Sequence, residues 1–228
     1  MTADHPRRRP VLQGSGAALA GLLFAVLFTV GFALLDQRPA ADASEEALTT
    51  YYRGSGGTTV LIAGAYLVPF AGVSFLWFLA ASRHRLSQLA KREDALLGTV
   101  QLGAGLLFVA VFFASAAAGV TGVMAIRLGG TSEAQTINGI PAMFEFGEAL
   151  LMIFAFRVAA VFIITSATRA LRAGLFPLWF AVLSYATGLV LLFVLSFVRS
   201  AVLLVPAWVA AATILTLFRR VTGRLEEA

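Results

Sequence analysis

The sequence contains no cysteine, one lysine (Lys91) and two histidines, His5 and His84. Without cysteine there can be no disulfides, thiolate catalysis, iron–sulfur clusters or cysteine-ligated zinc. Because the lysine and both histidines fall outside the long apolar runs, a bis-histidine haem between membrane helices and an intramembrane Ser–Lys pair are excluded too. The apolar runs hold no aspartate, and the chain has no HExxH, P-loop or GxSxG motif. We therefore expect no enzymatic activity, cofactor or metal site.

Charge is also scarce. Charged residues make up 13% of the 228 residues, whereas a soluble domain carries about 25%. Hydrophobic residues make up 59% of the chain, and the mean hydropathy is +0.87. Several apolar runs reach the ~18 to 20 residues that cross a bilayer as a helix. The composition predicts an all-α, polytopic transmembrane helical bundle.

The apolar runs predict six membrane spans in a single transmembrane domain covering residues 1–228. The last two spans come from one stretch, 174–218, which as a single helix would be about 67 Å long, roughly twice the bilayer core. It must therefore fold back, and the polar sequence SFVRS marks the turn. The first run is longer than the ~7 to 15 residues of a signal-peptide core, so we interpret it as a permanent anchor rather than a cleaved signal. The predicted spans are 14–35, 59–81, 95–126, 144–168, 174–196 and 200–218.

Basic residues between the spans fall into two unequal sets. The larger set contains Arg7, Arg8, Arg9, Arg83, Arg85, Lys91, Arg92, Arg169, Arg172, Arg219, Arg220 and Arg224. The smaller set contains Arg38, Arg53, Arg127 and Arg199. The positive-inside rule places the larger set and both termini in the cytoplasm of a bacterial cell, with the protein in its cytoplasmic membrane. This distribution accounts for the net charge of +5, and we expect no nucleic-acid partner.

The outer loop 36–58 has helix signals of its own. Asp42 can cap a helix, an acidic residue follows three positions later, and Gly54 can end the helix. We expect a short amphipathic helix on the outer surface, with Tyr51 and Tyr52 near the lipid headgroups. The pattern favours an ordered linker over a binding element.

A candidate polar site lies at the outer end of the fourth span. Glu145 and Glu148 are three residues apart and share a helix face. Arg127, at the outer end of the third span, is expected at a similar height. The three side chains form either an interfacial ion pair between two helices or a charged vestibule that selects solutes.

Arg157 is the second candidate, because it falls in the middle of the fourth span. A charge at that depth costs roughly 2.5–3.5 kcal/mol. Glu145 is about 18 Å away along the helix axis, and Glu148 projects from the opposite side. Arg157 must therefore bond neutral groups on neighbouring helices, snorkel along a groove, or contact water, a solute or a lipid headgroup. The remaining alternative is that the boundary of the span is misplaced. The candidate acceptors are Thr29, Gln101, Ser115, Ser184 and Tyr185.

Small residues recur at a spacing of four in the third span, which lets helix backbones approach closely. They are Ala114, Ala118 and Gly122, with Ser115 and Gly119 on the adjacent row. Pro141 is predicted to mark the start of the fourth helix, because proline fits a first helical turn and disrupts a helix interior.

Three stretches of sequence carry a resemblance to a known family. They are ADASEEALTTYYRG after the first span, LWFLAASRHRL at the end of the second, and TRALRAGLFPLWFAVLSYATGLVLL leading through the fifth. In these features the chain resembles a family of uncharacterised integral membrane proteins from GC-rich Gram-positive bacteria. That family has no assigned activity, so the resemblance implies six helices and no catalytic residue.

Together these features predict an integral membrane protein that acts without catalysis, through lipids or protein partners. The partners are membrane lipids, other membrane proteins or further copies of the chain. The alternative is a small-solute permease or channel, with Glu145, Glu148 and Arg127 at its mouth and Arg157 at its centre.

Overall fold

The computed structural model of the protein describes residues 12–39, 43–89, 95–128, 133–193 and 199–226. Within these ranges the ordered elements are all helical, as the sequence predicts. The helices are α1 (Leu12–Leu35), α2 (Glu45–Arg53), α3 (Ser55–Ile62), α4 (Val68–Leu89), α5 (Ala95–Leu128), α6 (Glu133–Ala149), α7 (Phe156–Arg172), α8 (Leu178–Phe193) and α9 (Leu204–Glu226). Two π-helical segments, η1 (Ala63–Leu67) and η2 (Leu150–Ala155), join α3 to α4 and α6 to α7, and a 3₁₀ turn, η4 (Arg199–Leu203), leads into α9.

Five of the described helices are long and apolar enough to cross a membrane. They are Ala18–Leu35, Ser55–Leu89, Ala95–Arg127, Gly139–Arg172 and Ser200–Arg219. The remaining apolar helix, α8, has 16 residues and is about 24 Å long, less than the ~30 Å thickness of the bilayer core.

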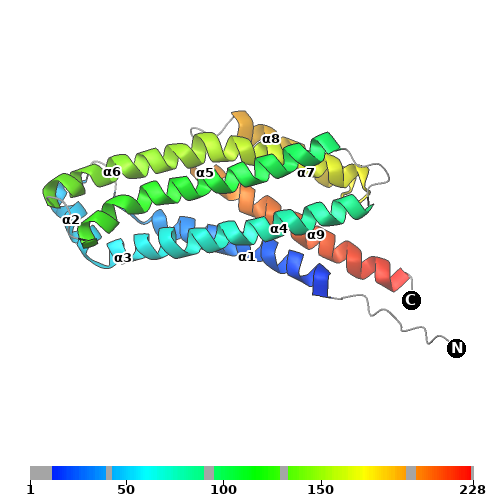
Figure 1. Ribbon diagram of the computed structural model, residues 1–228, viewed down its shortest axis with the longest axis horizontal. Coiled ribbons are helices and arrows are strands. Elements are labelled where there is room, and N and C mark those ends of the chain that lie inside the picture. The colour runs from blue at the N-terminus through cyan, green and yellow to red at the C-terminus, as the bar shows by residue number, and fades with distance from the viewer. Residues whose placement is uncertain (1–11, 40–42, 90–94, 129–132, 194–198, 227–228) are drawn as a thin grey trace.

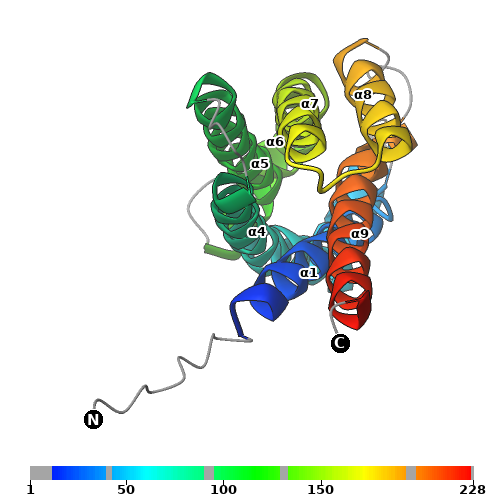
Figure 2. The same ribbon diagram turned by 90° about the vertical axis from the view of Figure 1, so that its right-hand side faces the viewer.

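The long helices form one elongated bundle. α1 begins and α9 ends at the same end of the bundle, and α2 lies at the opposite end (Figure 1). Seen from the end with the termini, α1, α4, α5, α7, α8 and α9 follow one another around the bundle (Figure 2). α1 packs on α4 and α9, α5 packs on α4, α6 and α7, and α7 packs on α8.

Phenylalanine rings fill the centre of this bundle. The ring of Phe75 on α4 lies 5.0 Å from that of Phe24, 5.0 Å from that of Phe108 and 5.1 Å from that of Phe162, measured between centroids. All four side chains are fully buried. Such tilted and edge-to-face contacts are favourable for aromatic pairs, and they tie α1, α4, α5 and α7 together.

The predicted close approach of small residues is confirmed between α5 and α6. The Ser115 hydroxyl of α5 donates a hydrogen bond to the backbone carbonyl of Gly147, with the oxygens 2.6 Å apart. A Cβ atom on Gly147 would lie 2.7 Å from the Ser115 carbonyl oxygen, and one on Gly122 would lie 2.4 Å from a side-chain carbon of Ile140. Only glycine allows this spacing, because any larger residue would push the helices apart.

The predicted start of the fourth helix at Pro141 is wrong. α6 begins at Glu133 and continues through Pro141, which lies inside the helix. Proline in a helix interior costs about 3 kcal/mol, because it removes one hydrogen bond and crowds the preceding turn. Burial of Ile140 and Phe144 beside it, against α5 and α2, offsets this cost.

The predicted outer helix is present as α2, and Gly54 caps its C-terminus. Its N-cap is Ser44, whose hydroxyl oxygen accepts a hydrogen bond from the Ala47 amide at 3.3 Å; the predicted cap, Asp42, lies outside the described residues. The helix is amphipathic, and Leu48 and Tyr52 face the bundle. Tyr52 is only 2% exposed, so it packs inward rather than presenting its ring at the surface.

Candidate functional site

A cavity of about 90 Å³ lies in the α2 half of the bundle, between α1, η1, α5, α6 and η2. Its wall is almost entirely apolar and includes Phe28 of α1, Phe112 of α5 and Met152 of η2. Three charged residues, Asp36, Arg38 and Glu148, also belong to the lining, and we call this charged part of the lining the mouth. The cavity therefore combines a largely apolar wall with one group of charged residues.

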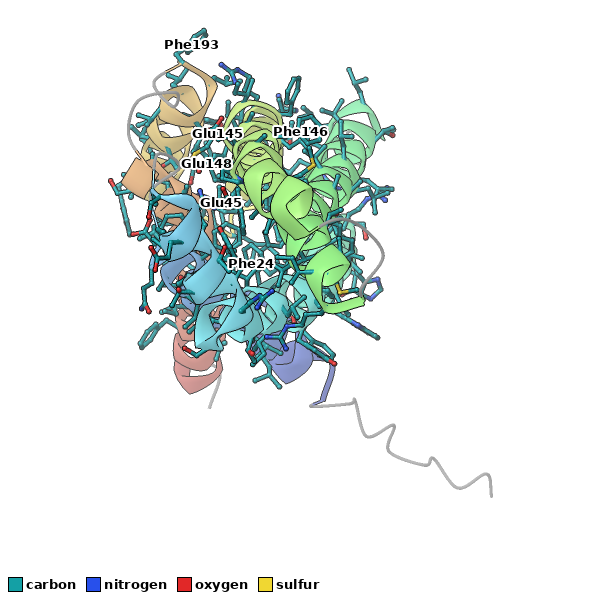
Figure 3. All side chains as sticks on the ribbon, turned by 90° about the vertical axis from the view of Figure 1, so that its left-hand side faces the viewer. Phe24, Glu45, Glu145, Phe146, Glu148 and Phe193 are labelled. Carbon is teal, nitrogen blue, oxygen red and sulfur yellow. The ribbon has the colours of Figure 1, made fainter. Side chains whose placement is uncertain are left out.

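An ion pair crosses this mouth. The Arg38 guanidinium Nη2 donates to the Glu148 carboxylate Oε2 at 2.5 Å, and the side chains are 17% and 32% exposed. The guanidinium carbon of Arg38 also lies 4.6 Å from the centroid of the Phe144 ring, in a cation–π contact. The pair links the segment after α1 to α6. Figure 3 looks onto this end of the bundle and shows Glu145 and Glu148 on one side of α6, with Phe146 on another.

The helix α2 packs beside the mouth. The Tyr52 ring stacks on Phe144 at a centroid distance of 6.2 Å, and the Tyr51 ring meets Tyr52 edge-on at 5.1 Å. Burial raises the pKa of Tyr52 to about 12, and the nearby Arg38 charge opposes this shift. Burial also raises the pKa of Tyr51, again against Arg38. Both phenols are therefore neutral near pH 7, and Arg38 has two neutral hydroxyl groups in its surroundings.

Both π-helical segments line the cavity. η1 contributes Gly64, and η2 contributes Leu151 and Met152. A Cβ atom on Gly64 would lie 2.2 Å from a methyl carbon of Val120, so glycine is needed for α5 to approach η1. π-Helical turns are rare and often mark functional sites. Because both π-helical segments line this cavity, we take the cavity as the candidate functional site.

The predicted polar site is divided in the structure. Glu148 lies at the cavity mouth and pairs with Arg38. Glu145 is exposed one turn away on the same helix. Arg127 donates instead to the Thr58 hydroxyl of α3, at 2.7 Å. Arg38 was missing from the predicted site, because its partner is 110 positions away and no local spacing relates the two.

Arg157 is held by its own helix. Its Nη1 donates to the Ile153 carbonyl oxygen at 2.5 Å, and this acceptor belongs to η2, where the widened π-helical turn disturbs the regular hydrogen-bond ladder. Phe154 and Val161, within one turn of Arg157, are exposed on the outside of the bundle, where Arg157 itself is partly exposed. Arg157 does not line the cavity.

Four of the five neutral groups proposed as acceptors for Arg157 bond other partners. Ser115 bonds Gly147, Ser184 accepts from the Trp208 indole at 2.8 Å, and Tyr185 bonds Thr168 at 3.0 Å. Gln101 accepts from Arg169, as described next. Thr29, the fifth, is exposed on α1.

A second polar cluster, which the sequence did not predict, lies near the other end of α7. The Gln101 side-chain oxygen accepts from the Arg169 guanidinium, and its nitrogen donates to the Ser166 hydroxyl at 2.8 Å. Gln101 is 0% exposed, and Arg169 is 6% exposed. The sequence indicated a solvated basic residue at Arg169. The signal available was Gln101 itself, a polar residue within the apolar run 95–126.

No protein-family model, curated protein or solved structure matches the chain. The family resemblance noted in the sequence stays a prediction.

Proposed function

We propose that this protein is a six-span integral protein of a bacterial cytoplasmic membrane, with both termini in the cytoplasm, and that it binds a membrane lipid in the cavity without catalysing a reaction. Three observations support the topology. Five helices have spanning length, α1 begins and α9 ends at one bundle end (Figure 1), and basic residues concentrate in alternate loops. The short α8 would be the sixth span, accommodated by local thinning of the bilayer at modest cost.

The shape and polarity of the cavity carry the proposal of a lipid ligand. The lining residues on α1 run from Phe28 to Leu35, which is about 10 Å along a helix axis. Half of a bilayer core is about 15 Å thick, so the cavity would extend from near the headgroups into the acyl-chain region. A volume of about 90 Å³ is below the roughly 300 Å³ of the smallest whole-ligand pockets. It therefore suits part of one acyl chain, with the headgroup outside at the mouth.

A solute permease is the alternative suggested by a charged mouth and an intramembrane arginine. Transport would require a polar path along the bundle axis. The rings of Phe24, Phe75 and Phe108 occupy that axis and are fully buried, which supports lipid binding over transport. Solute flux into proteoliposomes that Arg157→Leu abolishes would favour the permease instead.

Cysteine labelling tests the topology, because the chain has no cysteine of its own. Thr50 of α2 and Ser87 of α4 are exposed near opposite ends of the bundle. We expect a membrane-impermeant maleimide to label Thr50→Cys in intact cells, and to label Ser87→Cys only after permeabilisation. Labelling in the opposite order would invert the proposed orientation.

A cavity-filling substitution tests the lipid site. Gly31 lines the cavity, and a Cβ atom there would meet only Leu67, at 3.7 Å. Gly31→Leu should therefore fold and occupy the space of the acyl chain. We expect native mass spectrometry to show about tenfold less retained phospholipid than in wild type, the change that corresponds to about 1.4 kcal/mol of lost binding.

The matched control is Gly103→Leu. Gly103 is exposed on α5, and a Cβ atom there would meet nothing within 4 Å. This variant should retain lipid as wild type does. Equal retention by Gly31→Leu and wild type would mean that the cavity is not the lipid site.

A further inference from the structure

The side chain of Arg157 extends toward the α2 end of the bundle. Its Nη1 atom donates to the carbonyl oxygen of Ile153, a residue that lies one turn nearer to that end. Within the described residues this is the one hydrogen bond of a guanidinium that has five N–H donors and a permanent charge. Long basic side chains in membranes extend in this way toward the nearer headgroups. Arg157, which is partly exposed, therefore presents a cation on the outside of the bundle, directed toward one membrane surface.

The described helices supply no carboxylate near this cation. Glu148, the nearest acidic residue along the same continuous helix, is nine positions away in the sequence, which is about 14 Å along the axis. The helices α5 and α8 pack on α7, and neither contains an acidic residue. A charge within a membrane needs a compensating partner. The counter-charge of Arg157 must therefore come from its surroundings.

The short helix α8 brings the membrane surface to the height of Arg157. α8 runs beside α7 (Figure 2). A Cβ atom on Gly188 would lie 2.6 Å from a side-chain carbon of Ile164 and 3.4 Å from the Ala160 carbonyl oxygen, so Gly188 packs between these two residues. Five residues outward from this contact lie Arg157 on α7 and Phe193, the last residue of α8. The apolar surface of α8 therefore ends near Arg157, and a bilayer thinned to fit this ~24 Å helix has its headgroups there.

From these positions we infer that Arg157 binds the phosphate of an anionic phospholipid, on the outer surface of α7 and α8 and in the leaflet at the α2 end. The inference rests on the proposed topology, in which α8 spans the membrane. It does not rest on the cavity, which Arg157 does not line. The planar guanidinium can bond two phosphate oxygens, and the exposed rings of Phe154 and Phe193 offer apolar surface to the acyl chains.

The surroundings of Arg157 also predict which phospholipids bind. A zwitterionic lipid such as phosphatidylcholine brings a quaternary ammonium together with its phosphate. The exposed side chains around Arg157 are those of Ile153, Phe154 and Val161, and none of them carries a counter-charge for an ammonium. Phosphatidylglycerol brings only the negative charge that Arg157 lacks, so this site should prefer it.

The test is competitive lipid retention by the full chain in detergent. The protein is mixed with equal amounts of phosphatidylglycerol and phosphatidylcholine of identical acyl chains, and bound lipid is counted by native mass spectrometry. We expect wild type to retain an excess of phosphatidylglycerol. In Gly31→Leu, whose cavity is filled, the remaining lipid should be phosphatidylglycerol by about tenfold, the effect of one charge-assisted hydrogen bond. Phosphatidylcholine alone reads the cavity in Gly31→Leu and its control, because the Arg157 site favours the anionic lipid.

Two variants remove the site by different routes. Arg157→Gln removes the charge and should abolish the excess of phosphatidylglycerol, whereas Arg157→Lys keeps the charge without the planar fork and should retain part of it. Phe154→Glu leaves Arg157 in place and puts a carboxylate within one turn of it on the exposed face. This carboxylate should pair with Arg157 and also abolish the excess. Arg127→Gln, at an exposed arginine of α5 that bonds Thr58, is the matched control and should behave as wild type.

Four outcomes would overturn the assignment. Wild type and Gly31→Leu would retain the two lipids equally, or the excess would persist in both Arg157→Gln and Phe154→Glu. Loss of the excess on adding inorganic phosphate at constant ionic strength would identify free phosphate as the ligand. A membrane protein that copurifies with wild type but not with Arg157→Gln, without any lipid preference, would identify a carboxylate on a partner helix.

The cavity and the Arg157 site fail separately. Unchanged retention of phosphatidylcholine in Gly31→Leu overturns the cavity lipid and leaves the Arg157 site in place. An excess of phosphatidylglycerol that Gly31→Leu abolishes and Arg157→Gln keeps places the anionic lipid in the cavity, and overturns the assignment to Arg157.

Discussion

Replacing Trp208 by alanine is expected to lower the free energy of unfolding by about 3–5 kcal/mol, the usual cost of removing a large buried aromatic side chain. Trp208 is 5% exposed. Its ring lies 6.0 Å from that of Phe162 on α7 and 6.5 Å from that of Phe180 on α8, and its indole nitrogen donates to Ser184 at 2.8 Å. This side chain of α9 therefore packs α7 and α8 against each other, and denaturant unfolding in detergent measures its loss.

Two controls separate the size of the ring from its hydrogen bond and its position. Trp208→Phe keeps an aromatic ring and loses the indole donor, so it should cost about 1 kcal/mol, the net contribution of one hydrogen bond. Trp179→Ala removes an exposed tryptophan of α8, and it should change stability by less than about 0.5 kcal/mol. If Trp208→Ala were as stable as Trp208→Phe, the ring would not join α8 to the bundle.

Replacing Gln101 by leucine is expected to cost about 3 kcal/mol of unfolding free energy. The Gln101 amide accepts from the Arg169 guanidinium and donates to Ser166, and a hydrogen bond to a buried charged group contributes about 1.5–3 kcal/mol. Leucine has similar bulk but no acceptor, so the 6%-exposed Arg169 would lose its hydrogen bond to the residue 101 side chain. Denaturant titration in detergent measures the difference. Gln88→Leu, at an exposed glutamine of α4, is the matched control and should be nearly neutral.

A double-mutant cycle shows whether the cost of Gln101→Leu arises from Arg169. In the Arg169→Met background the hydrogen bond between the guanidinium and Gln101 is already absent, so Gln101→Leu should cost much less there. A coupling free energy of about 1 kcal/mol or more is expected for groups in one buried network. Additive effects of the two substitutions would show that the cluster is not an energetic unit.

The sequence predicted the helices better than their ends. Apolar runs dictate where the chain is helical, because a backbone surrounded by lipid must satisfy its hydrogen bonds internally. The apolar runs indicate only weakly at which residue a helix begins or ends. α6 extends upstream through Pro141, since the packing of Ile140 and Phe144 outweighs the intrinsic cost of the proline. Helix propensity alone carries no information about that packing.

The site was less predictable because it depends on residues far apart in the sequence. Glu148 was identified from its spacing to Glu145, but its partner Arg38 is 110 positions away. Arg157 was identified by its depth in an apolar run, and the structure gives it a backbone acceptor that the π-helical turn of η2 provides. Neither a π-helical turn nor a cavity has a sequence signature of its own, so the cavity could be found only in three dimensions.

The central claim, that a lipid chain occupies the cavity near α2, is tested most directly by photo-crosslinking. A phosphatidylethanolamine with a diazirine on its acyl chain is incorporated with the protein into nanodiscs, irradiated, and the adducts are located by peptide mass spectrometry. The account predicts adducts on the cavity lining at Phe28 and Met152, which Gly31→Leu strongly reduces. Adducts confined to outward-facing side chains such as Leu183 and Phe193, and unchanged in Gly31→Leu, would contradict it.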